Sequence, residues 1–182
     1  MKRNMIAVGL MTCLGATASA QAPQPYAGLQ ERPIKALSEQ QIADLKAGRG
    51  MGLALAAELN GYPGPSHLLE LAPQLDLSSD QQAAIRSLFD AMKAEAIPIG
   101  ESLIGQEEEL DRLFASHTVT PEALQTATRR IGETQARLRE AHLKYHLSTV
   151  ALLQPQQHVR YAALRGYAGR ASEHHHAPPR KN

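Results

Sequence analysis

Apolar side chains recur at steps of three and four residues along two long stretches of the chain. The first stretch, from Ser78 to Leu113, has the spacing of one face of an amphipathic α-helix. Ser78 or Ser79 can cap its start. Pro98 and Gly100 lie within it and predict a kink, because proline lacks a backbone N–H and its ring clashes with the preceding turn. The apolar positions are Ile85, Leu88, Phe89, Met92, Ala96, Ile99, Leu103, Leu110 and Leu113.

The second stretch follows a predicted turn at residues 117–119. Thr120 suits the N-cap of a helix and Pro121 suits its first position. Apolar side chains then recur every seven residues, as in the seam of a coiled coil. These seam positions are Leu124, Ile131, Leu138, Tyr145 and Leu152. The outward-facing ion pairs predicted from a four-residue spacing are Arg129–Glu133, Glu133–Arg137 and Glu140–Lys144. Two long helices joined by a short turn predict an all-α fold built on a long antiparallel helical hairpin.

Shorter helices are predicted on both sides of this hairpin. Ser38 can cap a helix over residues 38–59, although three glycines weaken its middle. Ser66 can cap a short helix before the hairpin, and Pro155 starts a last helix that continues to Tyr167.

The end of the second long helix is more apolar than a hairpin needs. Around Leu143, Leu147, Val150 and Leu153 the helix is apolar on nearly all sides. An isolated hairpin cannot bury such a surface, so we expect either a homodimer or close packing of the N-terminal helices.

The first twenty residues have the pattern of a secretory signal peptide. Lys2 and Arg3 precede an uncharged, apolar or small run from Met5 to Thr17, and residues 18–20 read A-S-A. Cleavage is expected after Ala20. The run is too short to span a bilayer, which needs about 20 apolar residues.

The rest of the chain divides into three parts. A proline-containing N-terminal arm over residues 21–36 is expected to be flexible. A single helical domain is predicted over residues 37–168. A flexible tail over residues 169–182 contains His174–His176, which can bind metal weakly or simply remain a disordered tract.

Charge and composition exclude several classes of function. With Lys2 and Arg3 removed, 17 of the 19 basic residues remain against 18 acidic residues, a formal charge of −1. This balance predicts no nucleic-acid partner. The only cysteine, Cys13, lies in the signal peptide, so the mature chain has no disulfide or thiolate site. Because the chain has no phosphate loop, dinucleotide fingerprint or nucleophile elbow, we do not expect an enzyme.

Three short segments share the form of a helix start: residues 37–41 (L-S-E-Q-Q), 77–81 (L-S-S-D-Q) and 153–157 (L-Q-P-Q-Q). Each has an apolar residue, a capping or proline position and then an acidic or amide group. In this context they resemble the L-T-x-x-Q motif of the Spy/CpxP family of periplasmic stress proteins. The stretch His142-Leu143-Lys144-Tyr145-His146 is similar to the metal-sensor branch of that family, which carries a histidine on this helix.

The resemblance implies a small, usually dimeric, α-helical protein of the Gram-negative periplasm. Our leading expectation is a heavy-metal-binding sensor or resistance accessory protein that reports to a membrane-anchored signalling partner. The alternative is an ATP-independent chaperone of the envelope stress response, which shields unfolded proteins. Arg129, Arg130, Arg137 and Arg139 are available for the cationic face of such a chaperone.

His142 and His146 are the first candidate metal ligands. They are four residues apart, so both imidazoles point to one side of the helix. Neutral imidazole is a common ligand of divalent zinc, nickel, cobalt and copper. The alternative is that both are packed or solvated side chains on a helix flank.

Hairpin register adds Glu95 to this candidate site. With the turn centred between Thr118 and Val119, residues whose numbers sum to 237 lie level with each other, so His142 lies level with Glu95. The pair predicts either a metal site or a plain hydrogen bond. The family resemblance implies His67 as a fourth ligand. The same register places His67 far from this level, and it reaches the site only if its helix crosses the hairpin.

Overall fold

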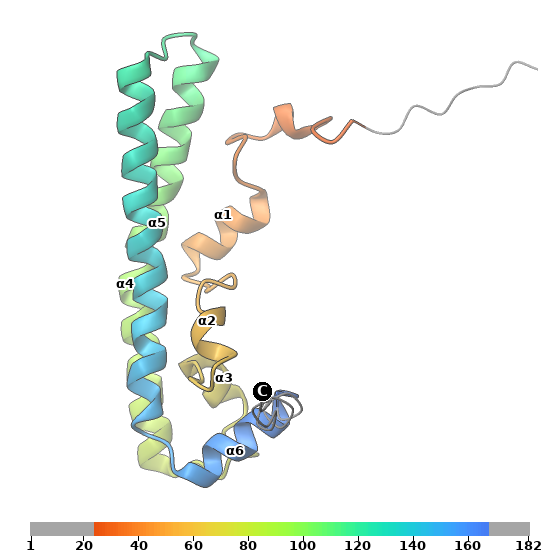
Figure 1. Ribbon diagram of the computed structural model, residues 1–182, viewed down its shortest axis with the longest axis vertical. Coiled ribbons are helices and arrows are strands. Elements are labelled where there is room, and N and C mark those ends of the chain that lie inside the picture. Colours follow the sequence, from red (N-terminus) through yellow and green to blue (C-terminus); the bar gives the residue numbers. More distant parts are fainter. Residues whose placement is uncertain (1–23, 168–182) are drawn as a thin grey trace, which may run out of the picture.

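The computed structural model describes residues 24–167. Within that range the chain forms six α-helices, a short 3-10 helix at Leu29–Glu31 and no strands, which confirms the predicted all-α class (Figure 1). The helices are α1 (Glu39–Lys46), α2 (Leu55–Glu58), α3 (Pro65–Glu70), α4 (Ser79–Ala115), α5 (Pro121–Val150) and α6 (Pro155–Leu164). The predicted signal peptide and the histidine tract of the tail lie outside the described residues. No helix within the described range has both the length and the hydrophobicity to cross a membrane.

Helices α4 and α5 form the predicted antiparallel hairpin (Figure 1). The Ser78 hydroxyl accepts the Gln81 N–H and the Gln81 side chain accepts the Ser78 N–H, which makes a complete capping box at the start of α4. Thr120 caps α5 by accepting the Ala123 N–H. Pro98 lies inside α4, and the helix continues through it.

The heptad seam is buried only in its middle. Ile131 and Leu138 are buried against Leu103 and its neighbours, whereas Leu124, near the hairpin turn, is 37% exposed. Of the three predicted ion pairs, Arg129 and Glu133 approach to 3.2 Å. The predicted Glu140–Lys144 pair is replaced by a contact between helices, because Lys144 binds the carboxylate of Glu95 on α4 instead.

The single helix predicted over residues 38–59 is wrong. Helix α1 ends at Lys46, and α2 begins only at Leu55. Gly48 adopts a φ of 64°, and the Arg49 N–H then donates to the Asp44 carbonyl at 2.9 Å, which ends α1. Glycine takes this left-handed conformation readily, so the glycine-rich stretch makes a loop rather than a weakened helix.

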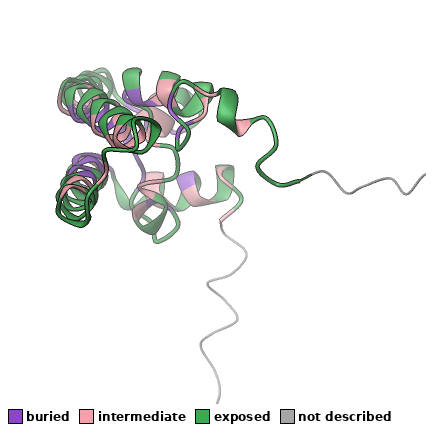
Figure 2. Ribbon diagram, turned by 90° about the horizontal axis from the view of Figure 1, so that it is seen from above, coloured by how far each residue is buried: buried purple, intermediate pink, exposed green. Residues whose placement is uncertain are grey.

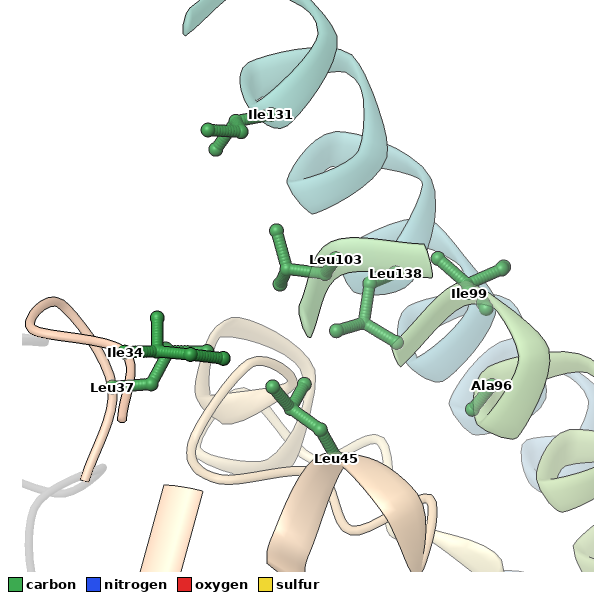
Figure 3. Packing of buried hydrophobic residues seen from close by; sticks show 9 residues of the cluster. Ile34, Leu37, Leu45, Ala96, Ile99, Leu103, Ile131 and Leu138 are labelled. Atoms are coloured by element: carbon green, nitrogen blue, oxygen red, sulfur yellow. The ribbon is translucent and has the colours of Figure 1, made fainter. Parts of the chain in front are cut away.

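The N-terminal segment lies along the hairpin and completes its core (Figures 1 and 2). Ile34, Leu37 and Leu45 pack against the buried side chains of α4 and α5 (Figure 3). The packed part therefore begins within the predicted arm, at Ile34. The shared cluster consists of Ile34, Leu37, Leu45, Ala96, Ile99, Leu103, Ile131, Leu138 and Ala141.

A second apolar cluster lies at the open end of the hairpin, where α3 and α6 meet the long helices. Gln81 and Gln157, the last residues of two of the helix-start segments, join these elements. The Gln81 side-chain amide donates to Gln157 Oε1 at 2.8 Å and to the Leu152 carbonyl at 2.7 Å. Helix α3 starts one residue before the predicted cap, with Gly64 as N-cap and Pro65 in the first position. The buried side chains are Leu68, Ala72, Leu75, Leu77, Ile85, Leu153 and Tyr161.

Candidate functional site

A cavity of about 550 Å³ lies between the N-terminal segment and the long helices. Its walls come from the α1–α2 loop, α2, the start of α3, and the facing sides of α4 and α5. The lining side chains that carry imidazole, carboxylate or thioether groups are Met51, Glu58, His67, Glu70, Met92, His142 and His146. Three of the four residues predicted from the sequence as metal ligands therefore share one cavity.

His142 is the most buried histidine in this cavity, with 2% of its surface exposed. Its Nε2 is buried and has no hydrogen-bond partner among the described residues. The ring lies against the α1–α2 loop, since a Cβ added to Gly50 would lie 3.6 Å from Nδ1. Burial, and secondarily the charge of His146, lower the pKa of His142 below its ordinary value. The ring is therefore a neutral imidazole with an unused nitrogen.

His146 lies one helical turn further along α5 and is held in a defined tautomer. Its Nδ1 lies 2.7 Å from the Tyr62 carbonyl oxygen. Because a carbonyl can only accept, Nδ1 carries the proton and Nε2 has the free lone pair. A Cβ added to Gly64 would lie 2.7 Å from both Nε2 and Cε1, so only glycine fits beside this edge of the ring. A backbone carbonyl that orients one imidazole nitrogen is a common feature behind metal-binding histidines.

Glu58 is a buried carboxylate that the sequence analysis did not identify. Its Oε1 accepts the hydroxyls of Tyr161 and Tyr167, and its Oε2 accepts the Gly64 N–H. Burial by itself raises the pKa of Glu58. Hydrogen bonds from His67 and Tyr161, the charge of His67 and the Gly64 N–H outweigh this and hold the pKa at about 2. A lone glutamate within the apolar run L-A-L-A-A-E-L was the signal that could have revealed it.

His67 reaches the cavity because α3 packs across both long helices. This is the crossing that the register argument required. Its Nδ1 lies 3.3 Å from Glu58 Oε1, so the ring is part of the network of polar contacts around Glu58. The ring also lines the cavity.

Glu95 does not join the histidines. Its carboxylate binds Lys144 Nζ at 2.6 Å and accepts the Tyr145 hydroxyl at 3.1 Å. The hydrogen bond from Lys144 is the main cause that lowers the pKa of Glu95. The register argument placed Glu95 level with His142, whereas its carboxylate contacts residues that lie two and three positions further along α5. Glu95 therefore faces Lys144 and Tyr145 rather than His142.

Histidine, cysteine and carboxylate side chains alone do not complete a metal site in the described part of the chain. Among residues 24–167, no three His, Cys, Asp or Glu side chains come together in an arrangement that could hold a metal ion. Apart from Glu70 and the network around Glu58 and His67, the lining carries the imidazoles of His142 and His146 and the thioethers of Met51 and Met92. No protein-family model matches the chain, and no curated protein or solved structure matches it significantly either.

Proposed function

We propose that this chain is a periplasmic heavy-metal-binding protein of the Spy/CpxP-like type, which acts as a sensor or as a resistance accessory. The observation that supports this function is the buried Nε2 of His142, an imidazole nitrogen without a hydrogen-bond partner in a residue that lines the cavity. An unpaired buried polar atom costs free energy unless something binds it. His146, one turn away and with Nδ1 already occupied by Tyr62, presents a second imidazole to the same cavity.

Metal titration tests this proposal. The protein is the mature chain with His174, His175 and His176 replaced by alanine, so that the tail contributes no binding. Zinc, nickel, cobalt and copper are each titrated by calorimetry. We expect one metal per chain, and we expect His142→Ala to lower the affinity by roughly 10- to 100-fold, the effect typical of losing even an outer-shell partner.

The control is His117→Ala, at the far tip of the hairpin, which should leave the affinity unchanged. Absence of uptake of any of these metals at micromolar concentration would remove the sensor function. Uptake that is insensitive to His142→Ala and His146→Ala would show that the binding residues lie elsewhere.

The same titration has an expected pH dependence. A metal competes with the proton for imidazole, so binding requires the neutral ring. Because the pKa of His142 lies below the ordinary value of 6.5, metal uptake should persist below pH 6.5 and be lost only at lower pH. A loss of affinity centred at or above pH 6.5 would contradict a buried His142 ligand.

A chaperone is the second candidate, favoured by apolar side chains that remain exposed in a single chain. Leu59 of the α2–α3 connection is 58% exposed, Leu147 of α5 is 62% exposed and Val159 of α6 is 72% exposed. Exposed apolar surface of this kind suits the binding of unfolded proteins or of a second copy of the chain. If the chain takes up no metal, suppression of the aggregation of an unfolded client becomes the decisive measurement.

A further inference from the structure

Both methionines of the mature chain line the same cavity. Of the five methionines in the sequence, three lie in the predicted signal peptide, and the other two are Met51 and Met92. They come from different elements, since Met51 belongs to the α1–α2 loop and Met92 to α4. Methionines that merely filled core gaps would not need to share one cavity with an unpaired histidine.

The loop that carries Met51 folds over His142. The Leu53 N–H donates to the Gly50 carbonyl at 2.7 Å, which closes a tight turn around Met51. Met51 itself has a φ of 43°, in the left-handed region that favours glycine. The turn keeps Gly50 against the His142 ring and leaves Met51 42% exposed. Met92, on α4, is only 7% exposed.

The charged side chains that line the cavity are two cations and two carboxylates. The cationic side chains of Arg49 and Lys93 contribute to the lining. Glu58 is already engaged by Tyr161, Gly64 and His67, as described above. Glu70, the other carboxylate of the lining, lies 3.2 Å from the Ser66 hydroxyl, which donates to it. Uncommitted donors at the buried wall are therefore neutral: an imidazole nitrogen and a thioether sulfur.

We propose that the cavity binds one monovalent copper ion through His142 Nε2 and the thioether sulfurs of Met92 and Met51. Thioethers are soft ligands that select monovalent copper, whereas zinc and nickel gain little from them. This inference rests on the proposed function, since it specifies which metal occupies the same site.

The test uses the mature chain with the three tail histidines replaced by alanine. The probes are monovalent copper, supplied anaerobically in competition with a chromogenic chelator, and silver(I) as its redox-stable analogue. Met92→Leu and Met51→Leu preserve size and hydrophobicity while removing the sulfur. Each should weaken the binding of both probes about tenfold or more, because removing even a residue that only orients a metal ligand typically lowers metal affinity by that much. Phe89→Leu, a change in the same lining without a donor atom, should leave the binding unchanged.

A second measurement does not depend on the stability of any variant. Methionines labelled with ¹³C at the terminal methyl should give two signals from the mature chain, assigned with the two leucine variants. Silver(I) bound to the sulfurs should shift both signals at one equivalent, whereas zinc should shift neither. If neither signal moves at one equivalent of silver(I), the copper site is overturned.

The two proposals fail in distinguishable ways. Zinc, nickel or cobalt uptake that depends on His142, with monovalent copper binding unaffected by the leucine variants, would overturn the copper inference and leave the proposed function standing. Absence of binding by every metal tested would overturn both.

Discussion

At the scale of single residues, Glu58 does the most to hold distant parts of the chain together. It lies at the end of α2 and accepts hydroxyls from Tyr161 of α6 and Tyr167 beyond it, while His67 of α3 approaches to 3.3 Å. Arg165 Nε lies 3.5 Å away as well. A carboxylate that is only 4% exposed requires such partners, because an unpaired buried charge is strongly destabilising.

Glu58→Gln is predicted to remove a pH dependence of stability. The folded-state pKa of about 2 lies below the ordinary value of 4.5. The ionised carboxylate therefore contributes stability that is present above pH 4.5 and is lost as the pH falls toward 2. The full contribution is on the order of 3 kcal/mol. In urea unfolding, the free energy of unfolding of Glu58→Gln should lie well below that of wild type at pH 6 and closer to it at pH 3.

The matched control is Glu133→Gln, which removes an exposed carboxylate paired with Arg129 on the surface of α5. Such a pair contributes about 0 to 1 kcal/mol, so the free energy of unfolding of this variant should stay close to that of wild type at both pH values. Equal destabilisation of Glu58→Gln at pH 3 and pH 6 would show that the charge of Glu58 is not the source of its effect.

At the scale of elements, the contact between α1 and α4 depends on a glycine within a long helix. The sequence suggested that Gly100 would help Pro98 to kink α4. In the fold its role is a close approach, because a Cβ on Gly100 would lie 2.7 Å from the Leu45 carbonyl oxygen and 3.3 Å from its Cα. Both are backbone atoms, which cannot rotate away. The absence of a side chain at Gly100 allows α1 to pack closely against α4.

Gly100→Ala is therefore predicted to destabilise the fold. Forcing a methyl group against backbone costs about 1–3 kcal/mol, which exceeds the gain in helix propensity of up to about 1 kcal/mol. Gly105→Ala, on an open face of the same helix, meets no atom within 4 Å and should stabilise by that gain alone. Thermal unfolding followed by circular dichroism distinguishes the two. A stabilised Gly100→Ala variant would mean that α1 does not pack closely on α4.

At the scale of the whole molecule, the hairpin is covered on one side and open elsewhere. The N-terminal segment covers one side of the hairpin (Figure 2). Leu138 is buried, whereas Leu147, nine residues further along α5, stays exposed. The apolar surplus predicted at this end of α5 is therefore only partly covered by the N-terminal helices. The uncovered part is where we propose that a homodimer forms.

Two aspartate substitutions on α5 are predicted to separate folding from association. Leu138→Asp places an unpaired carboxylate in the core, which costs several kcal/mol, and should abolish the cooperative helical signal. Leu147→Asp adds the same charge at an exposed position and should keep wild-type helicity while shifting sedimentation from dimer to monomer. Wild-type sedimentation of Leu147→Asp would place the interface elsewhere, and wild-type helicity of Leu138→Asp would show that the seam is not core.

The sequence alone determined those features that depend on contacts three or four residues apart. The cap at Ser38 and the proline starts at Pro121 and Pro155 were predicted and are present, and of the two serines proposed to cap α4 it is Ser78 that does so. The apolar period of α4 and α5 likewise predicted the hairpin. These signals are local, because a helix end satisfies its own backbone groups and a helix face follows from a fixed rotation per residue.

Only the tertiary structure decided which side chains meet across helices. Glu95 contacts Lys144 and Tyr145 rather than His142, since sequence spacing fixes neither the exact register of a hairpin nor the rotation of one helix against the other. Glu58 is a buried carboxylate with partners because side chains of α3 and α6, His67 and Tyr161, reach it. The cavity that joins Met51 to His142 exists because the glycine loop turns over α5, a position that depends on long-range packing rather than on local preference.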